Sequence, residues 1–316
     1  MPNLDLVCSI AGFSLVGVAI LLYVGRVVFH GVAKFDRVEK DKGSALFGAS
    51  LMQAGYWSLD YVGRGLSALG ATANSISLGS LVLGIGAGVA LAFGHYGLGA
   101  LLAVLSALGD TLDGIVARLQ GTASDAGEVL DAAVDRYEEF FFLGGIVVHV
   151  RQSAIGVSVV LFALLGSFMV SYATAKAEAL RAHVPRGAMR RPERAAYLII
   201  GAGLTPILAP VIAANLPAAY AGSTWLLEAP ALGAVLLVAL VANVSAVRRL
   251  GKLFASVGGP RVPAAPVVVA AVAAPVVTAP AEVVTTASPT NAPLESGVVR
   301  TGSREPEALA PVDATR

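Results

Sequence analysis

Residues 110–135 read DTLDGIVARLQGTASDAGEVLDAAVD, and this stretch decides the fold because it sets two acidic pairs into apolar surroundings. Asp110 and Asp113 are three residues apart, and Asp131 and Asp135 are four apart, so each pair lies on one face of a helix. The residues between the pairs are numerous enough to turn the chain back. We therefore predict two neighbouring helices whose acidic faces meet near one end.

The composition indicates a membrane protein. Of the 316 residues, 56% are hydrophobic and 14% are charged, whereas soluble domains carry about 25% charged residues. The net charge of +1 shows no excess of basic residues for binding nucleic acid, so we expect membrane lipid and no nucleic acid among the partners. Cys8 is the single cysteine, which excludes an intramolecular disulfide and a multi-cysteine metal site.

Stretches of about 20 apolar residues can cross a bilayer as helices. The first such stretch, residues 6–29, lacks a basic leading region and a cleavage site, so we expect a retained N-terminal anchor. Residues 46–69 mix aromatic side chains and Arg64 with apolar ones, which suits an amphipathic helix lying in the interface. The six other predicted spans cover residues 74–93, 98–119, 129–150, 155–179, 195–214 and 225–247.

We therefore predict an all-α integral membrane fold. It comprises a six-transmembrane-helix bundle with an extra N-terminal transmembrane helix, an interfacial amphipathic helix and a disordered C-terminal tail. Residues 1–45 would form the membrane anchor and a cytoplasmic linker, and residues 46–254 the membrane domain. Residues 255–316 are rich in Pro, Ala and Val, and their prolines interrupt every apolar run before it is long enough to span.

The basic residues predict the orientation, because Lys and Arg stay on the cytoplasmic side. With the N-terminus outside, one set of loops and helix ends is rich in Lys and Arg, and the opposite set holds only Arg151. We therefore expect a protein of the cytoplasmic (inner) membrane with its acidic end and its tail in the cytoplasm. The basic set comprises Arg26, Lys34, Arg37, Lys40, Lys42, Arg118, Arg181, Arg186, Arg190, Arg191, Arg194, Arg248, Arg249 and Lys252.

The four aspartates predict a metal site. An ionisable group inside a span costs about 2.5–3.5 kcal/mol on insertion scales and usually marks function. Four converging carboxylates need compensating charge, which two divalent cations would supply, and an all-oxygen ligand set favours Mg²⁺ or Mn²⁺. The alternative is that aspartates here are helix caps or solvated charges, and that alternative accounts for Asp125, which we expect to cap the second acidic helix.

The same segment resembles the signature of the CDP-alcohol phosphatidyltransferase family, Asp-x2-Asp-Gly-x2-Ala-Arg-x8-Gly-x3-Asp-x3-Asp, and matches every fixed position. The resemblance covers residues 72–252. It implies a membrane enzyme that moves a phosphatidyl group from CDP-diacylglycerol to a small alcohol and releases CMP. Members of the family are commonly dimeric, so the resemblance also implies a homodimer.

The resemblance assigns roles by position. Asp110, Asp113 and Asp131 would hold the metal ions, with Asp135 near them as a further ligand and as the general base. Residues that would line the CDP site are Gly114, Ala117, Arg118 and Gly127.

Physical reasons support that CDP site. The two glycines remove side chains and let a nucleotide approach the backbone, and Arg118 offers a forked donor to phosphate. The family often opens its first core helix with Thr-Pro-Asn. Here the matching residues are Thr72, Ala73 and Asn74, so the proline is missing and Asn74 is a weaker candidate for a nucleotide contact.

A second group of charged residues closes one predicted helix and opens the next. The stretch SYATAKAEAL at 171–180 contains Lys176, and RRPER at 190–194 contains Arg191 and Arg194. Two guanidinium groups three residues apart and one ammonium group make a candidate pocket for the acceptor's phosphate. The alternative is that these residues only anchor cytoplasmic helix ends.

This second group is similar to that of the actinobacterial phosphatidylinositol-phosphate synthases within the family. Those have a Ser-Tyr-x3-(Arg)-Ala-Glu helix end and a Glu-Arg-x-Glu-Arg helix start. Here Lys176 stands in place of the arginine, Thr174 in place of a lysine and Arg190 in place of the first glutamate. The resemblance implies inositol phosphate as the leading acceptor, with glycerol 3-phosphate, which would give phosphatidylglycerophosphate, as the alternative.

A competing hypothesis from another class is a divalent-cation carrier with the aspartates as its transport site. Carriers commonly place such sites near the midplane and are built from repeated halves. Here the acids lie at one membrane face and the sequence has no evident repeat, so the enzyme is favoured.

Two further predictions concern residues outside the motif. His95 and His149 should lie at the opposite membrane face from the aspartates. The closely spaced glycines of the first core span should allow close helix packing. These are Gly79, Gly84, Gly86 and Gly88.

Overall fold

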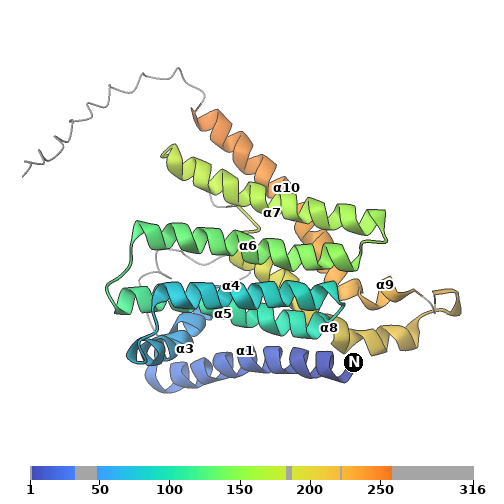
Figure 1. The fold of residues 1–316 in the computed structure, drawn as a ribbon, viewed down its shortest axis with the longest axis horizontal. Helices are drawn as coiled ribbons and strands as arrows, with labels where there is room; N and C mark the ends of the chain where they lie inside the picture. The colour runs from blue at the N-terminus through green and yellow to red at the C-terminus, as the bar shows by residue number, and fades with distance from the viewer. Residues whose placement is uncertain (1, 33–47, 183–186, 221–222, 258–316) are drawn as a thin grey trace, which may run out of the picture. The chain divides into compact units, whose positions relative to one another are not determined.

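The computed structural model describes residues 2–32, 48–182, 187–220 and 223–257, and every regular element within them is helical (Figure 1). These residues belong to one compact unit. The predicted linker within 33–45 and residues 258–316 of the predicted tail lie outside the described residues, whereas residues 255–257 of that tail belong to the last helix. The long helices are α1 (Pro2–His30), α3 (Ala49–Ala68), α4 (Ala73–Ala92), α5 (Tyr96–Leu119), α6 (Asp125–His149), α7 (Ala154–Ala179), α8 (Arg191–Asn215) and α10 (Ala229–Val257).

Two short helices, η1 (Ala218–Tyr220) and α9 (Thr224–Leu227), connect α8 to α10. This connection corrects the last predicted span, 225–247, because Trp225 lies in α9 and not in the spanning helix. Helix α10 also continues to Val257, so Arg248, Arg249 and Lys252 lie on its last turns and not in a loop.

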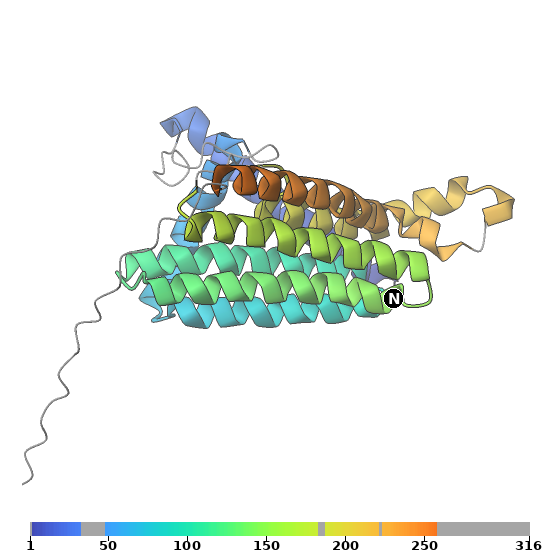
Figure 2. The ribbon, with the colours of Figure 1, turned by 90° about the horizontal axis from the view of Figure 1, so that it is seen from above.

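Within the described residues, six helices are long and apolar enough to cross a membrane, namely α1, α4, α5, α7, α8 and α10. Helix α6 falls outside this set because charged residues crowd its first half, from Asp131 to Glu139. It nevertheless has 25 residues and lies between α4 and α7, both of which it contacts (Figures 1 and 2). The predicted all-α membrane fold with an extra N-terminal helix is therefore confirmed, and α6 completes the six-helix bundle.

Helices α4 and α6 approach each other backbone to backbone. A Cβ at Gly88 would lie 2.3 Å from the carbonyl oxygen of Phe141, and one at Gly145 would lie 2.1 Å from the carbonyl oxygen of Gly88. The prediction of close packing therefore holds for Gly88. It is wrong for Gly79, where an added Cβ would meet nothing within 4 Å.

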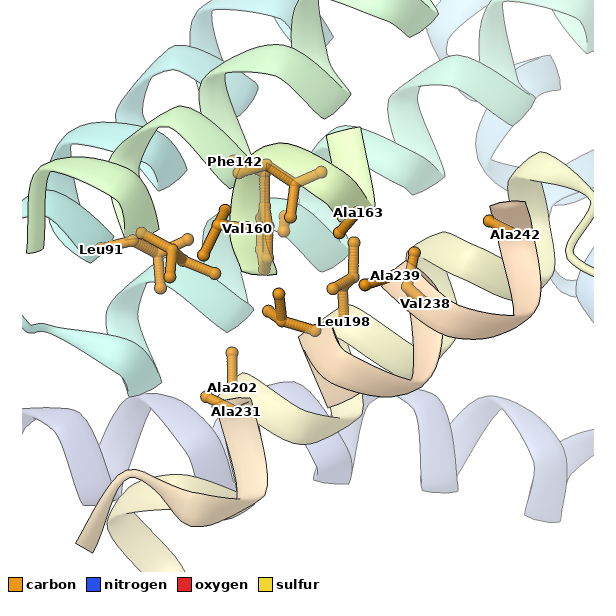
Figure 3. Close-up of a cluster of buried hydrophobic side chains, with 14 of the residues drawn as sticks. Leu91, Phe142, Val160, Ala163, Leu198, Ala202, Ala231, Val238, Ala239 and Ala242 are labelled. Carbon is orange, nitrogen blue, oxygen red and sulfur yellow. The ribbon is translucent and has the colours of Figure 1, made fainter. Parts of the chain in front are cut away.

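Buried side chains from α4, α5, α6, α7, α8 and α10 form the main core (Figure 3). Large side chains such as Leu91, Phe142 and Val160 fill the space between helices. Small residues stand where helices come closest, as at Ala163 and Ala242, both fully buried. Such small residues let helices approach closely, and the resulting van der Waals packing favours association in lipid, where apolar burial alone gives little advantage.

Helix α1 is docked on the bundle. The Asp5 side chain accepts a hydrogen bond from the backbone N–H of Leu98 at 3.1 Å and lies 2.9 Å from Nδ1 of His95. A Cβ at Gly97 would lie 1.9 Å from the Asp5 carbonyl oxygen, so glycine is required for this contact. The predicted anchor is thus packed against the start of α5 near one membrane face.

Helix α3 is not apolar enough to count as a span, as predicted for an interfacial helix. Its buried side presents Ala54 and Leu59 to α1 and α5, and Tyr61 is 64% exposed on its outer side. A Cβ at Gly63 would lie 2.6 Å from Ile115 Cγ2, so α3 packs closely on the helix that carries the first acidic pair.

The two histidines lie away from the aspartates. His149 ends α6, fourteen residues beyond Asp135, which corresponds to about 21 Å at 1.5 Å per residue. Its Nε2 lies 2.8 Å from Glu228 Oε1, and the Tyr96 hydroxyl donates to the other oxygen of Glu228 at 3.2 Å. The histidines therefore tie helix ends together on the opposite face.

Candidate active site

The turn between α5 and α6 brings the two acidic pairs together. Gly121 has φ +66°, a left-handed conformation that favours glycine, and it reverses the chain directly after α5. Ser124 then caps α6, because its extended backbone lets its Oγ accept a hydrogen bond from Gly127 N at 3.2 Å. This corrects the prediction for Asp125, which is the exposed first residue of α6 and not its cap.

The four predicted aspartates meet. Asp110, Asp113 and Asp131 each offer a carboxylate oxygen, and the three oxygens lie within 4.8 Å of one another. Asp110 and Asp135 form a second such group with Glu138. The sequence prediction missed Glu138, although it follows Asp135 by three residues and so shares its helix face.

Two features show that the cluster is suited to a cation. Asp110 Oδ1 is buried and has no hydrogen-bond partner among the described residues, although a buried polar atom normally has one. The oxygen-only donor set is the kind that Mg²⁺ and Mn²⁺ prefer. Ser77 on α4 holds Asp113 in place by donating a 2.5 Å hydrogen bond to its Oδ2.

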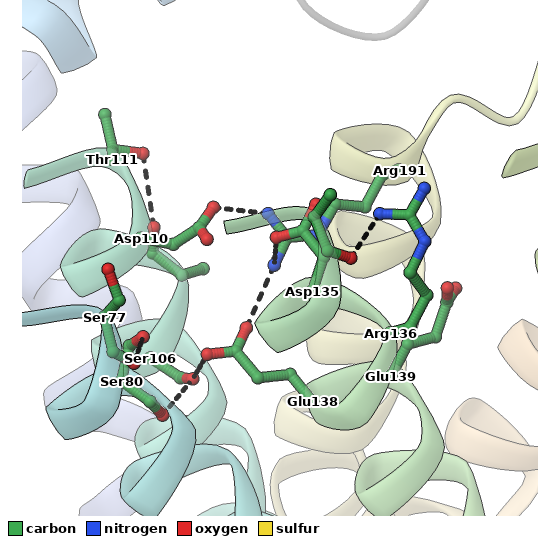
Figure 4. A network of polar contacts seen from close by, with 12 residues as sticks. Ser77, Ser80, Ser106, Asp110, Thr111, Asp135, Arg136, Glu138, Glu139 and Arg191 are labelled. Atoms are coloured by element: carbon green, nitrogen blue, oxygen red, sulfur yellow. Dashed lines mark hydrogen bonds and ion pairs between the residues drawn. The ribbon is translucent and has the colours of Figure 1, made fainter. Parts of the chain in front are cut away.

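Arg191, the first residue of α8, lies within the cluster (Figure 4). It donates to Asp110 and, through Nη2, to Glu138 at 2.9 Å. The same Nη2 lies 2.7 Å from Asp135 Oδ1, in an ion pair that lacks the alignment of a hydrogen bond. One guanidinium therefore contacts three carboxylates and offsets only part of their charge, and it ties α8 to both α5 and α6.

Arg194 is engaged elsewhere and is only 1% exposed. Its Nε and Nη2 each donate to the Glu139 carboxylate at 2.8 Å, and its Nη1 donates to the Met189 carbonyl at 2.8 Å. Its Nη2 also lies 3.3 Å from Ser171 Oγ. The prediction that Arg194 binds an acceptor's phosphate is not supported by this arrangement, because its donors already serve the protein.

The remaining predicted residues occupy the same end of the bundle. Lys176 is exposed on the last turns of α7. Arg118 borders a cavity of about 180 Å³ between α5 and α3, together with Tyr56 and Asp60. The three predicted acceptor residues thus have different surroundings: Arg191 lies in the carboxylate cluster, Arg194 is buried and Lys176 is exposed.

The predicted CDP-site residues differ in how far packing explains them. A Cβ at Gly127 would meet only Ser124 Oγ, at an ordinary 3.5 Å, so the protein's own packing does not require glycine there. Asn74 is exposed in the first turn of α4. Thr72 caps that helix in a reciprocal pair with Ser75, which gives it a structural role. Gly114 and Ala117 are half-buried on α5, beside Asp113 and Arg118 in the chain.

Comparison with known proteins identifies the family. Residues 71–242, more than half of the chain, match the family model of the CDP-alcohol phosphatidyltransferases, and this range contains both acidic pairs. The chain belongs to this family. A phosphatidyltransferase is an enzyme, so the carrier hypothesis falls away.

The relatives of this phosphatidyltransferase include phosphatidylinositol phosphate synthases. It is 34% identical over 168 residues to the one from Mycobacterium marinum, which covers 52% of this chain and 70% of the relative. It is also 34% identical over 141 residues to the one from Corynebacterium glutamicum, covering 42% of this chain and 64% of that protein. The chain therefore spans about two thirds of the length of these relatives.

The fold of this phosphatidyltransferase is also found in solved structures. The crystal structure of the Mycobacterium tuberculosis phosphatidylinositol phosphate synthase with CDP-DAG bound has a TM-score of 0.54 and 24% identity. The match covers 65% of this chain and 98% of that chain. Another crystal structure of the same synthase is a complex with manganese and citrate, and it has the same TM-score.

Proposed function

We propose that this phosphatidyltransferase moves the phosphatidyl group of CDP-diacylglycerol to inositol phosphate and releases CMP. The observation that carries the proposal is the meeting of Asp110, Asp113 and Asp131 at the end of α5 and the start of α6. The names of the relatives and the charged residues where α7 ends and α8 begins favour inositol phosphate as the acceptor.

Two divalent cations, Mg²⁺ or Mn²⁺, would be held by Asp110, Asp113, Asp131 and Asp135. When bound, they would neutralise the pyrophosphate and stabilise the charge that develops on the leaving CMP. Ser77 fixes Asp113 for this task, and the unpartnered Oδ1 of Asp110 is free to act as a ligand.

The protein's own groups perform the transfer. Asp135 accepts the proton of the acceptor hydroxyl, whose oxygen forms a bond to the phosphorus attached to the lipid. The bond from that phosphorus to the bridging oxygen breaks, and CMP leaves with that oxygen. An ionised aspartate beside cations is a weak base, so positioning contributes more to the rate than basicity does.

Different residues bind the two substrates. Gly114, Ala117, Arg118 and Gly127 line the CDP moiety, with Asn74 at the edge. Arg191, with Lys176, binds the acceptor's phosphate. Arg194 positions α8 through Glu139, since its donors are occupied.

We also propose that the site faces the cytoplasm in the inner membrane and that the protein is a homodimer. The Lys and Arg residues gathered at the aspartate end favour this orientation. Chemical crosslinking in native membranes would test the dimer.

The decisive experiment measures CMP release by the full-length protein in detergent, with CDP-diacylglycerol and a panel of acceptors. Inositol phosphate should be used far better than unphosphorylated inositol or glycerol 3-phosphate. A preference for glycerol 3-phosphate would assign the alternative acceptor. Activity with unphosphorylated inositol equal to that with inositol phosphate would refute a phosphate pocket.

A further inference from the structure

Glu138 is a fifth carboxylate that the family signature does not include. It lies on α6 and is 9% exposed. Arg191 Nη2 donates to its Oε2 at 2.9 Å, and Ser106 Oγ lies 2.7 Å from its Oε1. A carboxylate buried to this degree is costly unless it is paired, so the contact with Arg191 is the one that keeps it there (Figure 4).

Three helices provide the setting for this side chain. A Cβ at Gly84 on α4 would lie 2.8 Å from Glu138 Cγ and 3.3 Å from Ser106 Oγ, so glycine leaves the space. Ser106 on α5 has one hydroxyl proton and two acceptors at 2.7 Å, the Ser80 carbonyl and Glu138 Oε1, and it serves one at a time. Arg191 comes from α8 and supplies the opposite charge.

The three carboxylates around Arg191 are not equivalent. Asp110 and Asp135 are proposed ligands of divalent cations, so a cation and the guanidinium would share their oxygens. Glu138 lies outside that ligand set. A guanidinium has five N–H donors in a planar fork, so Nη2 can keep its bond to Glu138 while other donors meet a phosphate.

We propose that Glu138 is a positioning residue that holds Arg191 for the acceptor's phosphate. The inference rests on the proposed function and adds a residue that determines acceptor affinity. The competing role is that of a further metal ligand, because Glu138, Asp110 and Asp135 bring oxygens within 4.8 Å of one another. The two roles predict different measurements.

The first measurement is steady-state kinetics of the full-length protein in detergent with Glu138→Gln, which keeps the size and removes the charge. The KM for inositol phosphate should rise about five-fold to ten-fold, as expected for loss of one charge-assisted contact. The KM for CDP-diacylglycerol should not change. The matched control is Glu128→Gln, an exposed glutamate in the first turn of α6, which should change neither constant.

A double-mutant cycle tests whether Glu138 acts through Arg191. In an Arg191→Ala background, Glu138→Gln should produce no further rise in the acceptor KM. Gly84→Ala, which crowds Glu138 and keeps its charge, should raise the acceptor KM in the same selective way. Additive effects in the cycle, or equal rises in both KM values, would overturn the positioning role.

The last measurement is Mn²⁺ binding, followed by electron paramagnetic resonance during titration of the purified protein. Glu138→Gln should bind as many Mn²⁺ ions as the wild type. Loss of one ion would make Glu138 a metal ligand and overturn the inference. A wild type that releases no CMP with inositol phosphate would refute the proposed function and this inference together, whereas an active wild type with an unchanged Glu138→Gln KM would refute the inference alone.

Discussion

The two arginines at the start of α8 are three residues apart and have different surroundings. Arg191 keeps 27% of its side chain exposed and faces three carboxylates, whereas Arg194 is buried and paired with Glu139 through two hydrogen bonds. Spacing predicted that both would face one pocket. It could not reveal the pair with Glu139, because that partner lies 55 residues away and meets Arg194 only in the folded bundle.

Substituting each arginine by alanine should show that the two residues have different roles. Arg194→Ala should lower the free energy of unfolding by about 3–5 kcal/mol, because it leaves the Glu139 charge buried and unpaired. Arg191→Ala should instead raise the KM for inositol phosphate by about ten-fold or more, with little change for CDP-diacylglycerol. Denaturation in detergent and substrate kinetics would measure the two effects. An Arg194→Ala protein of normal stability and raised acceptor KM would restore Arg194 as a phosphate ligand.

Whole helices were easier to predict than their ends. Apolar runs identified every long helix in the described residues, but α6 begins at Asp125 and α8 at Arg191, each four residues before the predicted start. At α8, Arg191 and Arg194 find partners inside the bundle, which hydropathy cannot register, whereas the charged first turn of α6, with Asp125 and Glu128, is exposed. The four aspartates were predictable because their spacing alone puts them on helix faces, whereas the burial of Arg194 required knowledge of how α6 and α8 pack.

The close contact between helices α4 and α6 gives a prediction about stability. Gly88→Ala should destabilise the protein by about 1–3 kcal/mol, since the new methyl group would overlap the Phe141 carbonyl of α6. Gly79→Ala on the same helix is the control, because its methyl group would meet open space. Unfolding of both variants in detergent would measure the difference. Equal stability of the two variants would mean that this helix contact is looser than the backbones indicate.

For the molecule as a whole, we propose that α6 crosses the bilayer together with the six apolar helices, which would place the two ends of the membrane body on opposite sides. A reporter fused directly after Val257 should be cytoplasmic, and one placed before Pro2 should be outside. The imbalance of Lys and Arg between the two faces is the reason. Activity of the fused reporters in intact cells would show on which side of the membrane each one lies. A cytoplasmic N-terminus would mean that α1, although docked through Asp5, does not cross the membrane.

The central claim is that the carboxylates of α5 and α6 form the metal site of phosphatidyl transfer. Its most direct test measures CMP release and Mn²⁺ binding for Asp110→Asn, Asp113→Asn, Asp131→Asn and Asp135→Asn in the purified protein. Each variant should lose activity by at least about a hundred-fold, beyond the ten-fold to hundred-fold that is typical of outer-shell changes at metal sites. Each should remain membrane-inserted and bind less Mn²⁺, and Asp125→Asn should behave as wild type. Near-normal CMP release by any two of the four variants would contradict the claim.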